Sequence, residues 1–123
     1  LRDVKLYGCE VWRGLDWLPD SDKIALDVSQ HSDLQEALLT AFESQIAGGK
    51  RYDLATIGRR LANATYYQSH ATDTASRMVY AMDLTPLLHN PALEVNRFIS
   101  SHLLSFANEV IERVQRLHGR STE

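Results

Sequence analysis

The C-terminal third of this chain is the sequence feature that most limits what the chain can fold into. Residues 91–118 predict a single amphipathic helix, with Asn90 as its cap, Pro91 at the first helical position and Gly119 after the last turn. At about 1.5 Å per residue this helix is about 42 Å long, whereas a compact chain of this length has a radius of gyration near ~14 Å. The helix must therefore cross the whole domain or project from it.

The apolar side chains of this helix fall on two stripes when they are placed at about 100° per residue. Together the stripes cover about 200° of the circumference, which is wider than the face of roughly 100° that a single core needs. Two interpretations stay open: the helix is the centre of a bundle, or its second stripe meets another subunit. The heptad spacing of the first stripe is short and irregular, so it does not predict a free coiled coil. The first stripe is Val95, Ile99, Leu103, Phe106, Val110, Val114 and Leu117, and the second is Leu93, Leu104 and Ile111, bridged by Ala107.

The N-terminal part of the chain predicts a small β element. Residues 3–13 alternate irregularly between apolar and polar side chains and include β-branched and aromatic residues, and residues 23–28 read as a second short strand. We expect a β-hairpin within residues 1–30, supported by helices because two strands alone are marginally stable. Cys9 lies in the first strand and is expected to be a small buried side chain.

Three further helices are expected between the hairpin and the long helix. The first begins at a capping-box pattern, residues 32–35, and ends before Gly48 and Gly49. The second begins after a cap at Asp53 and runs to about residue 69, and the third is shorter. That third helix is capped by Thr72 or Asp73 and bears Met78, Val79 and Met82.

The predicted fold is therefore mainly α, a four-helix and largely antiparallel bundle with a long C-terminal helix and a small N-terminal β-hairpin. We expect one domain over residues 1–123, with the hairpin and its loop in 1–30, the bundle in 32–118 and a frayed tail in 119–123.

Composition excludes some partners. The net charge of -3 argues against a general binder of nucleic acid or anionic membranes, although a local basic patch stays possible. No run reaches the ~18 apolar residues of a membrane span, and one cysteine cannot form an internal disulfide. We therefore expect a cytoplasmic chain with no membrane partner.

The sequence offers little for metal binding or catalysis. Its five histidines show no H-x-x-x-H or E-x-x-H spacing and no cysteine partner, so we expect no metal and no cofactor. One R-x4-H pair, Arg97 and His102, is similar to the pair of the helical ribonucleases called HEPN domains, in which the two side chains act on a phosphodiester. Phe98 stands where that family commonly has a polar residue, and no family is assigned.

Basic and aromatic side chains cluster around the second predicted helix. Arg59 and Tyr66 are seven residues apart and share a side of that helix, as do Arg60 and Tyr67 one step round. With Arg77 they could bind single-stranded RNA, form a protein interface or cover apolar surface.

The sequence favours a helical interaction or assembly module that self-associates, most simply as a homodimer, or binds another protein, and it favours a non-enzyme. We expect its contacts at Leu93, Leu104, Ile111, Tyr66, Tyr67 and at Trp17, whose alternative role is to cover the core. The second hypothesis is an RNA-binding or metal-independent RNA-cleaving domain that uses Arg97 and His102, with Arg59, Arg60 and Arg77 holding the RNA.

Overall fold

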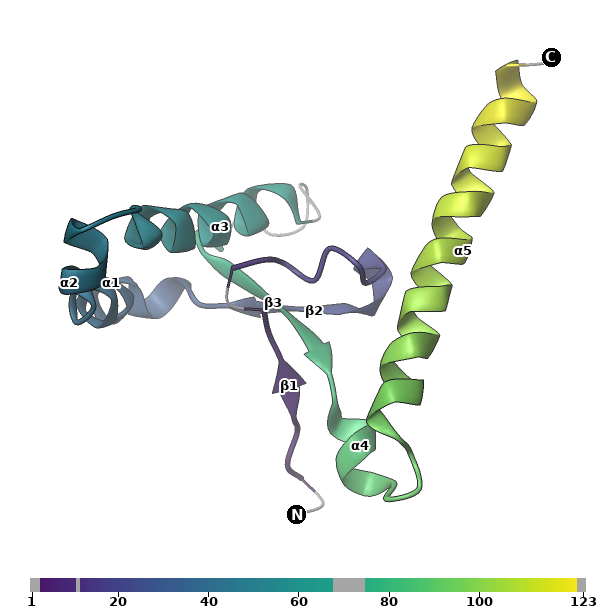
Figure 1. Cartoon of the computed structure of the whole chain (residues 1–123), viewed down its shortest axis with the longest axis horizontal. Helices are drawn as coiled ribbons and strands as arrows, with labels where there is room; N and C mark the ends of the chain where they lie inside the picture. The colour runs from purple at the N-terminus through teal and green to yellow at the C-terminus, as the bar shows by residue number, and fades with distance from the viewer. Residues whose placement is uncertain (1–2, 11, 68–74, 122–123) are drawn as a thin grey trace. The chain divides into compact units, whose positions relative to one another are not determined.

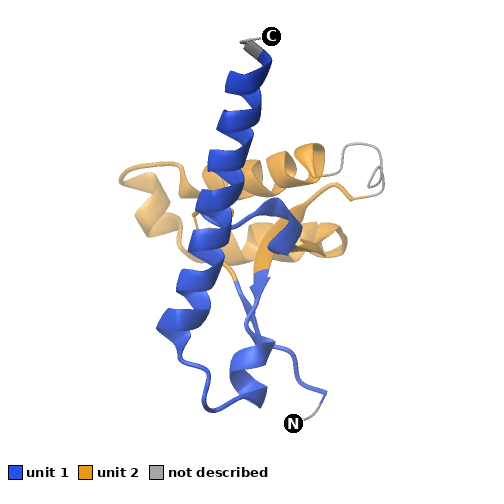
Figure 2. Cartoon of the chain, turned by 90° about the vertical axis from the view of Figure 1, so that its right-hand side faces the viewer, with its two compact units in different colours: residues 1–8, 15–23, 82–123 blue, residues 9–14, 24–81 orange. Residues whose placement is uncertain are grey.

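The computed structural model describes residues 3–10, 12–67 and 75–121 and shows a mainly helical chain with one small sheet (Figure 1). The chain divides into two compact units, which Figure 2 colours separately. Unit 1 contains Leu1–Gly8, Leu15–Lys23 and Met82–Glu123, and unit 2 contains Cys9–Gly14 and Ile24–Ala81.

The sheet corrects the expected N-terminal hairpin. It is antiparallel and contains β1 (Tyr7–Gly8), β2 (Lys23–Asp27) and β3 (Met78–Asp83), in the order β1-β3-β2. β1 pairs with β3, so that Tyr7 lies opposite Asp83 and Gly8 opposite Met82. A hairpin within residues 1–30 is therefore wrong, because a strand from much later in the chain lies between its two strands.

β3 also replaces the short helix that was expected around Met78 and Met82. Those two residues are four positions apart, a spacing that places side chains on one face of either a helix or a strand. Both methionines and Ala81 are buried. Val79 and Tyr80 between them are β-branched and aromatic, which suits a pleated strand. The spacing alone is ambiguous, and the pairing of this segment with β1 makes it a strand.

Unit 2 contains two helices where one was expected between residues 33 and 47. They are α1 (Ser32–Thr40) and α2 (Glu43–Ala47), preceded by a 3₁₀ turn, η2 (Ser29–His31). The hydroxyl of Thr40 donates to the carbonyl of Glu36 one turn earlier, a bond that often bends helices, and the chain leaves helical geometry at Phe42. The capping box does not form, because Ser32 is already helical and Gln35 donates instead to the Val28 carbonyl.

α3 (Tyr52–Tyr66) packs against α1 in the same unit (Figure 1). It ends at Tyr66 because Tyr67 is extended. The expected stretch to residue 69 and the caps at Thr72 or Asp73 lie outside the described residues. Asn63 of α3 is buried and its side-chain amide donates to the carbonyl of Met78, which connects the helix to β3.

Unit 1 has a small core of its own. Leu15, Leu18 and Met82 are buried together, and Trp17, Leu84, Phe98 and Ile99 pack against them. The loop that carries Trp17 thus covers the core, which was one of the two roles expected for it. The same unit contains η1 (Asp20–Asp22) and α4 (Thr85–His89).

The long C-terminal helix, α5, spans Val95–Ser121, so it begins and ends later than the expected 91–118. Asn90 makes a turn instead of a helix cap: its side chain accepts from the Ala92 amide and its carbonyl accepts from Leu93. Gly119 lies inside the helix, so the tail expected to fray at residue 119 is helical to Ser121. The described residues form five α-helices, and the four-helix bundle stays a prediction.

Candidate interaction surface on the long helix

One side of α5 attaches the helix to its own unit. Phe98 and Ile99 pack on the core of unit 1. His102 meets the ring of Phe98 edge-on at a centroid distance of 5.0 Å, and its Nδ1 lies 3.4 Å from a carboxylate oxygen of Asp22. Phe106, one turn later, is half-buried. These contacts come from the first half of the helix.

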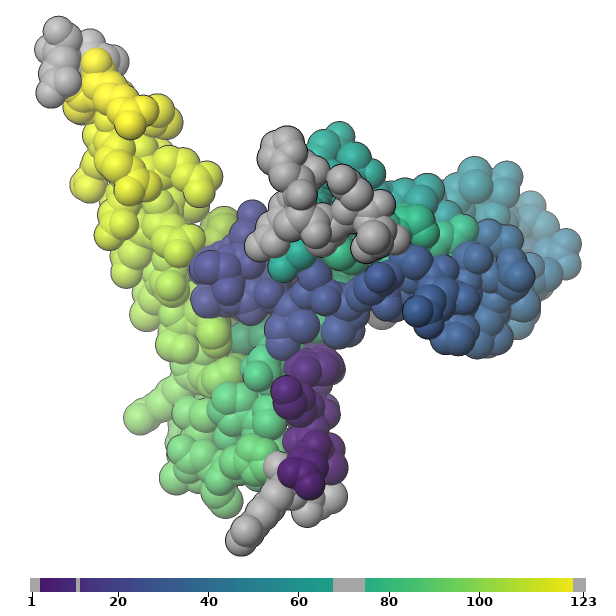
Figure 3. All heavy atoms as spheres, turned by 180° about the vertical axis from the view of Figure 1, so that it is seen from behind, coloured from purple at the N-terminus to yellow at the C-terminus, as the bar shows by residue number. Residues whose placement is uncertain are grey.

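The remaining apolar side chains of α5 are exposed. Every described side chain from Ala107 to Arg120 is exposed, and Figure 3 shows this end of the helix in yellow. Aliphatic side chains along the helix keep between 41% and 65% of their surface in solvent. The six that form the candidate surface, called the exposed face below, are Leu103, Leu104, Val110, Ile111, Val114 and Leu117.

The middle of the exposed face lies on a different side of α5 from the side that attaches the helix to unit 1, which is called the attached face below. At about 100° per residue, Phe98, His102 and Phe106 are centred about 120° away from the middle of the exposed face, which is close to Val114. Ile99 lies at the border of the two sides, in line with Leu117 five turns later. The charged side chains of the helix lie outside the sector of the exposed face. They are Arg97, Glu109, Glu112, Arg113, Arg116 and Arg120.

The exposed face changes the interpretation of both sequence stripes. As members of the first stripe, Leu103, Val110, Val114 and Leu117 were expected to be buried in a core, as in a helix at the centre of a bundle. The structure leaves all four side chains exposed. Leu104 and Ile111, which were expected to contact a partner, are 65% and 52% exposed on the same side of the helix. The signal that sequence reasoning missed is the absence of Asp, Glu, Lys and Arg from this whole sector.

The other expected contact residues do not join the exposed face. Leu93 precedes α5 and is half-buried, and Trp17 packs on the core of unit 1. Tyr66 and Tyr67 belong to unit 2. Tyr66 is 81% exposed, whereas the ring of Tyr67 lies against that of Tyr80 at a centroid distance of 5.8 Å.

The structure does not bring Arg97 and His102 together as a catalytic pair. Five residues on a helix correspond to a rotation of about 140° relative to one another. Arg97 is exposed and its nearest ion-pair partner is Glu94, at 3.6 Å. His102 faces the opposite way, toward Phe98 and Asp22. One phosphodiester between the two side chains would need a different orientation of at least one of them.

The basic cluster of unit 2 is partly buried. Burial, and then the charge of Arg77, lower the pKa of Arg60, and the guanidinium of Arg60 donates to the Gln35 amide oxygen at 2.5 Å. Arg77 pairs with Glu36 at 3.0 Å, and its second terminal nitrogen, Nη1, is buried without a hydrogen-bond partner among the described residues. Arg59 is exposed. The structure thus brings Arg60 and Arg77 close but leaves Arg59 on the outside.

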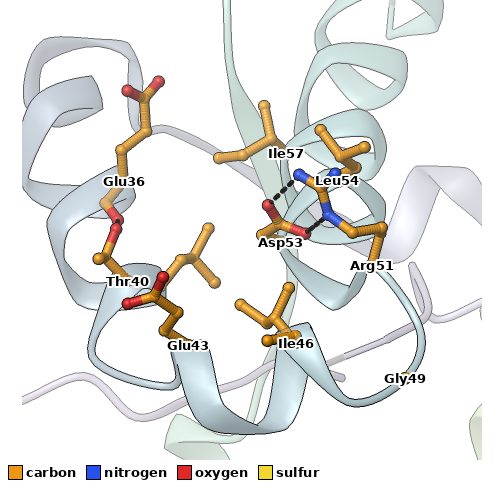
Figure 4. A pocket seen from close by; sticks show the side chains of 11 residues that line it. Glu36, Thr40, Glu43, Ile46, Gly49, Arg51, Asp53, Leu54 and Ile57 are labelled. Carbon is orange, nitrogen blue, oxygen red and sulfur yellow. Dashed lines mark hydrogen bonds and ion pairs between the residues drawn. The ribbon is translucent and has the colours of Figure 1, made fainter.

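A hollow of about 670 Å³ lies between α1, α2 and α3 of unit 2 (Figure 4). Its floor is aliphatic, with Ile46, Leu54 and Ile57, and carboxylates stand around it. Arg51 and Asp53 form an ion pair of 2.7 Å at its edge. That hydrogen-bonded pair lowers the pKa of Asp53 to about 2.

A smaller hollow of about 230 Å³ in unit 2 is lined in part by Cys9, Arg13, Arg60 and Tyr80. The residue Cys9 is exposed, so its expected burial is wrong. Partial burial of the thiol raises its pKa, which lowers the fraction of reactive thiolate. The hollow therefore gives no activated nucleophile.

No protein-family model, curated protein or solved structure matches this chain. None of the helices among the described residues is both long and apolar enough to span a membrane.

Proposed function

We propose that this chain is an assembly module that self-associates through the exposed face of α5. The observation that carries the proposal is the row of six aliphatic side chains, 41–65% exposed, on a side of the helix without a charged residue. Single exposed apolar residues are ordinary, whereas a continuous exposed patch marks an interaction site.

The size of the exposed face suits a small dimer interface. A leucine-sized side chain holds about 60–120 Å² of apolar surface, so six that are half exposed present roughly 300 Å² per copy. Two copies would bury roughly 600 Å² of apolar surface, and about 1,000 Å² in total once polar atoms are included. This is near the lower limit of specific interfaces, and we therefore expect a dissociation constant in the micromolar range.

The test is the molar mass in solution over a range of concentrations. The wild-type chain of 13.9 kDa should approach twice that mass, and the double variant Leu104→Gln with Ile111→Gln should stay at one chain. The matched control is Glu109→Gln with Glu112→Gln, which changes two positions on the charged side of the same helix and should still associate. A wild-type mass of one chain at every concentration contradicts the proposal.

RNA binding is a second candidate, and one observation favours it. Arg60 and Arg77 lie close enough for the charge of Arg77 to lower the pKa of Arg60, and the exposed Arg59 is next to Arg60 in α3. Neighbouring guanidinium groups are suited to bind successive phosphates.

The RNA candidate is tested by incubating labelled single-stranded RNA with the wild type, with Arg60→Gln plus Arg77→Gln, and with His102→Ala. RNA binding predicts that the wild type shifts the RNA and that the double arginine variant binds at least about tenfold more weakly. RNA cleavage predicts products that disappear with His102→Ala. If the wild type neither binds nor cleaves the RNA, this candidate is removed.

A further inference from the structure

The exposed side of α5 contains a regular seam, formed by four residues of the exposed face together with Ser100 and Ala107. When the half-buried residues Phe98, Ile99, His102 and Phe106 are set apart, the middle of the remaining sector follows a strict alternation of three and four residues. This is the heptad spacing that keeps one side of a helix against a neighbouring helix. The seam consists of Ser100, Leu103, Ala107, Val110, Val114 and Leu117.

Larger and smaller side chains alternate along this seam. Leu103, Val110 and Leu117 recur every seven residues, and the smaller Ser100 and Ala107 recur with Val114 in the other set. Packing of two helices is favourable where layers are filled evenly, because a cavity between apolar side chains costs about 24 cal/mol per Å³. The alternation therefore constrains how a second helix can be placed.

A parallel pair would fill the seam unevenly. In a parallel pair each residue faces its own copy, so Ala107 would face Ala107 and leave a gap, while Leu103 would face Leu103. In an antiparallel pair the two sets of positions face each other, and each layer receives one smaller and one larger side chain. With the twofold axis between residues 108 and 109, the layers are Ser100 with Leu117, Leu103 with Val114 and Ala107 with Val110.

The flanks of the seam and the charges of the helix agree with this orientation. Across the same axis, Leu104 of one copy lies on the same flank as Ile111 of the other, so these two residues of the second stripe each gain an apolar neighbour. Arg113, Arg116 and Arg120 gather at the C-terminal end of α5, and a parallel pair would bring both sets to one end. An antiparallel pair separates them and opposes the two helix dipoles.

We propose that α5 pairs with α5 of a second copy in an antiparallel orientation, about a twofold axis between residues 108 and 109. This inference rests on the proposed self-association and adds the orientation and register of the partner. The attached face stays on the core of unit 1 in each copy, and the exposed end of one helix lies along the first half of the other.

The orientation is tested with two single-cysteine chains in a Cys9→Ser background, Ser100→Cys and Leu117→Cys, oxidised separately and as a mixture. The antiparallel register keeps the two copies of residue 100 about 25 Å apart along the helix axis, far beyond the ~7 Å limit between disulfide-linked Cα atoms. We expect at least tenfold more disulfide-linked dimer in the mixture than in either chain alone.

The possible outcomes distinguish failure of the antiparallel orientation from failure of the proposed self-association. Cross-linking of each chain with itself indicates a parallel pair, and it overturns this inference while the proposed function stands. A dimeric mass without cross-linking in the mixture places the interface elsewhere and also overturns it. Monomeric mass of the Cys9→Ser parent overturns the proposed function and the inference with it. Val114→Cys mixed with Leu103→Cys gives a second test of the same register, should Leu117→Cys fail to associate.

Discussion

Replacement of Leu117 by Gln tests the exposed face quantitatively. Leu117 is 59% exposed in the structure, so its change should leave the free energy of unfolding of the monomer almost unaltered, and Gln is as good a helix former as Leu. In the dimer the side chain is buried. Complete burial of a leucine side chain is worth about 1.5–3 kcal/mol, of which the exposed fraction is about 1–2 kcal/mol per copy.

Because each dimer contains Leu117 twice, the loss is about 2–4 kcal/mol, and the dissociation constant should rise about 30- to 1,000-fold. Sedimentation equilibrium over a wide concentration range measures that constant for the wild type, for Leu117→Gln and for Arg116→Gln. Arg116 is also exposed but lies on the charged side, and its variant should dissociate within about threefold of the wild type. An equal effect of the two variants would refute the assignment of the interface to the exposed face.

Three further predictions concern the folded chain itself. Leu18→Ala should lower the free energy of unfolding by about 2–5 kcal/mol in urea titrations, because Leu18 is 1% exposed in the core of unit 1, and a loss below about 1 kcal/mol would contradict that core. Asn63→Ala should lower it by about 1–3 kcal/mol, since the buried amide donates to the Met78 carbonyl, whereas an unchanged midpoint would argue against this bond. Arg51→Gln should raise the pKa of Asp53 from about 2 toward its ordinary value in an NMR titration. Because the pKa of Asp53 is lowered in the folded chain, the ion pair stabilises the fold at pH values above the pKa of the unfolded chain, and this contribution is lost as the pH falls toward 2. A pKa of Asp53 unchanged by that substitution would show that Arg51 is not the cause.

Local patterns predicted the helices well where the helical period was long and unambiguous. α5 is close to its expected span because its apolar positions repeat over many turns, and α3 begins near the expected cap at Asp53. The ends were less predictable. Gly119 could end the helix by taking a positive φ, but no described glycine has a positive φ, and the helix continues through Gly119.

The topology of the sheet could not be read from local sequence. Met78 and Met82 have a spacing common to helices and strands, and only the pairing of β3 with β1 shows which applies. That pairing joins residues more than seventy positions apart, and contacts of this kind depend on the whole chain.

The candidate surface was predicted in part. Leu104 and Ile111 were expected to meet a partner, but Leu103, Val110, Val114 and Leu117 were assigned to a core because apolar side chains at helical spacing are most often buried. The sequence shows that the apolar surface of the helix is too wide for one neighbour. The side of α5 that attaches to unit 1 is set by the packing of Phe98 and Ile99 on the core that contains Leu15 and Leu18. This packing exists only in the folded unit.

The antiparallel pairing of α5 is tested by the distance between spin labels attached at residue 97 of two copies, in the variant Arg97→Cys with Cys9→Ser. The side chain of Arg97 is 81% exposed and lies outside the seam, so the label does not enter the interface. The antiparallel register predicts a separation of about 35 Å along the helix axis, measured by pulsed electron spin resonance. A separation below about 20 Å indicates a parallel pair, and the absence of dipolar coupling at concentrations well above micromolar would contradict self-association itself.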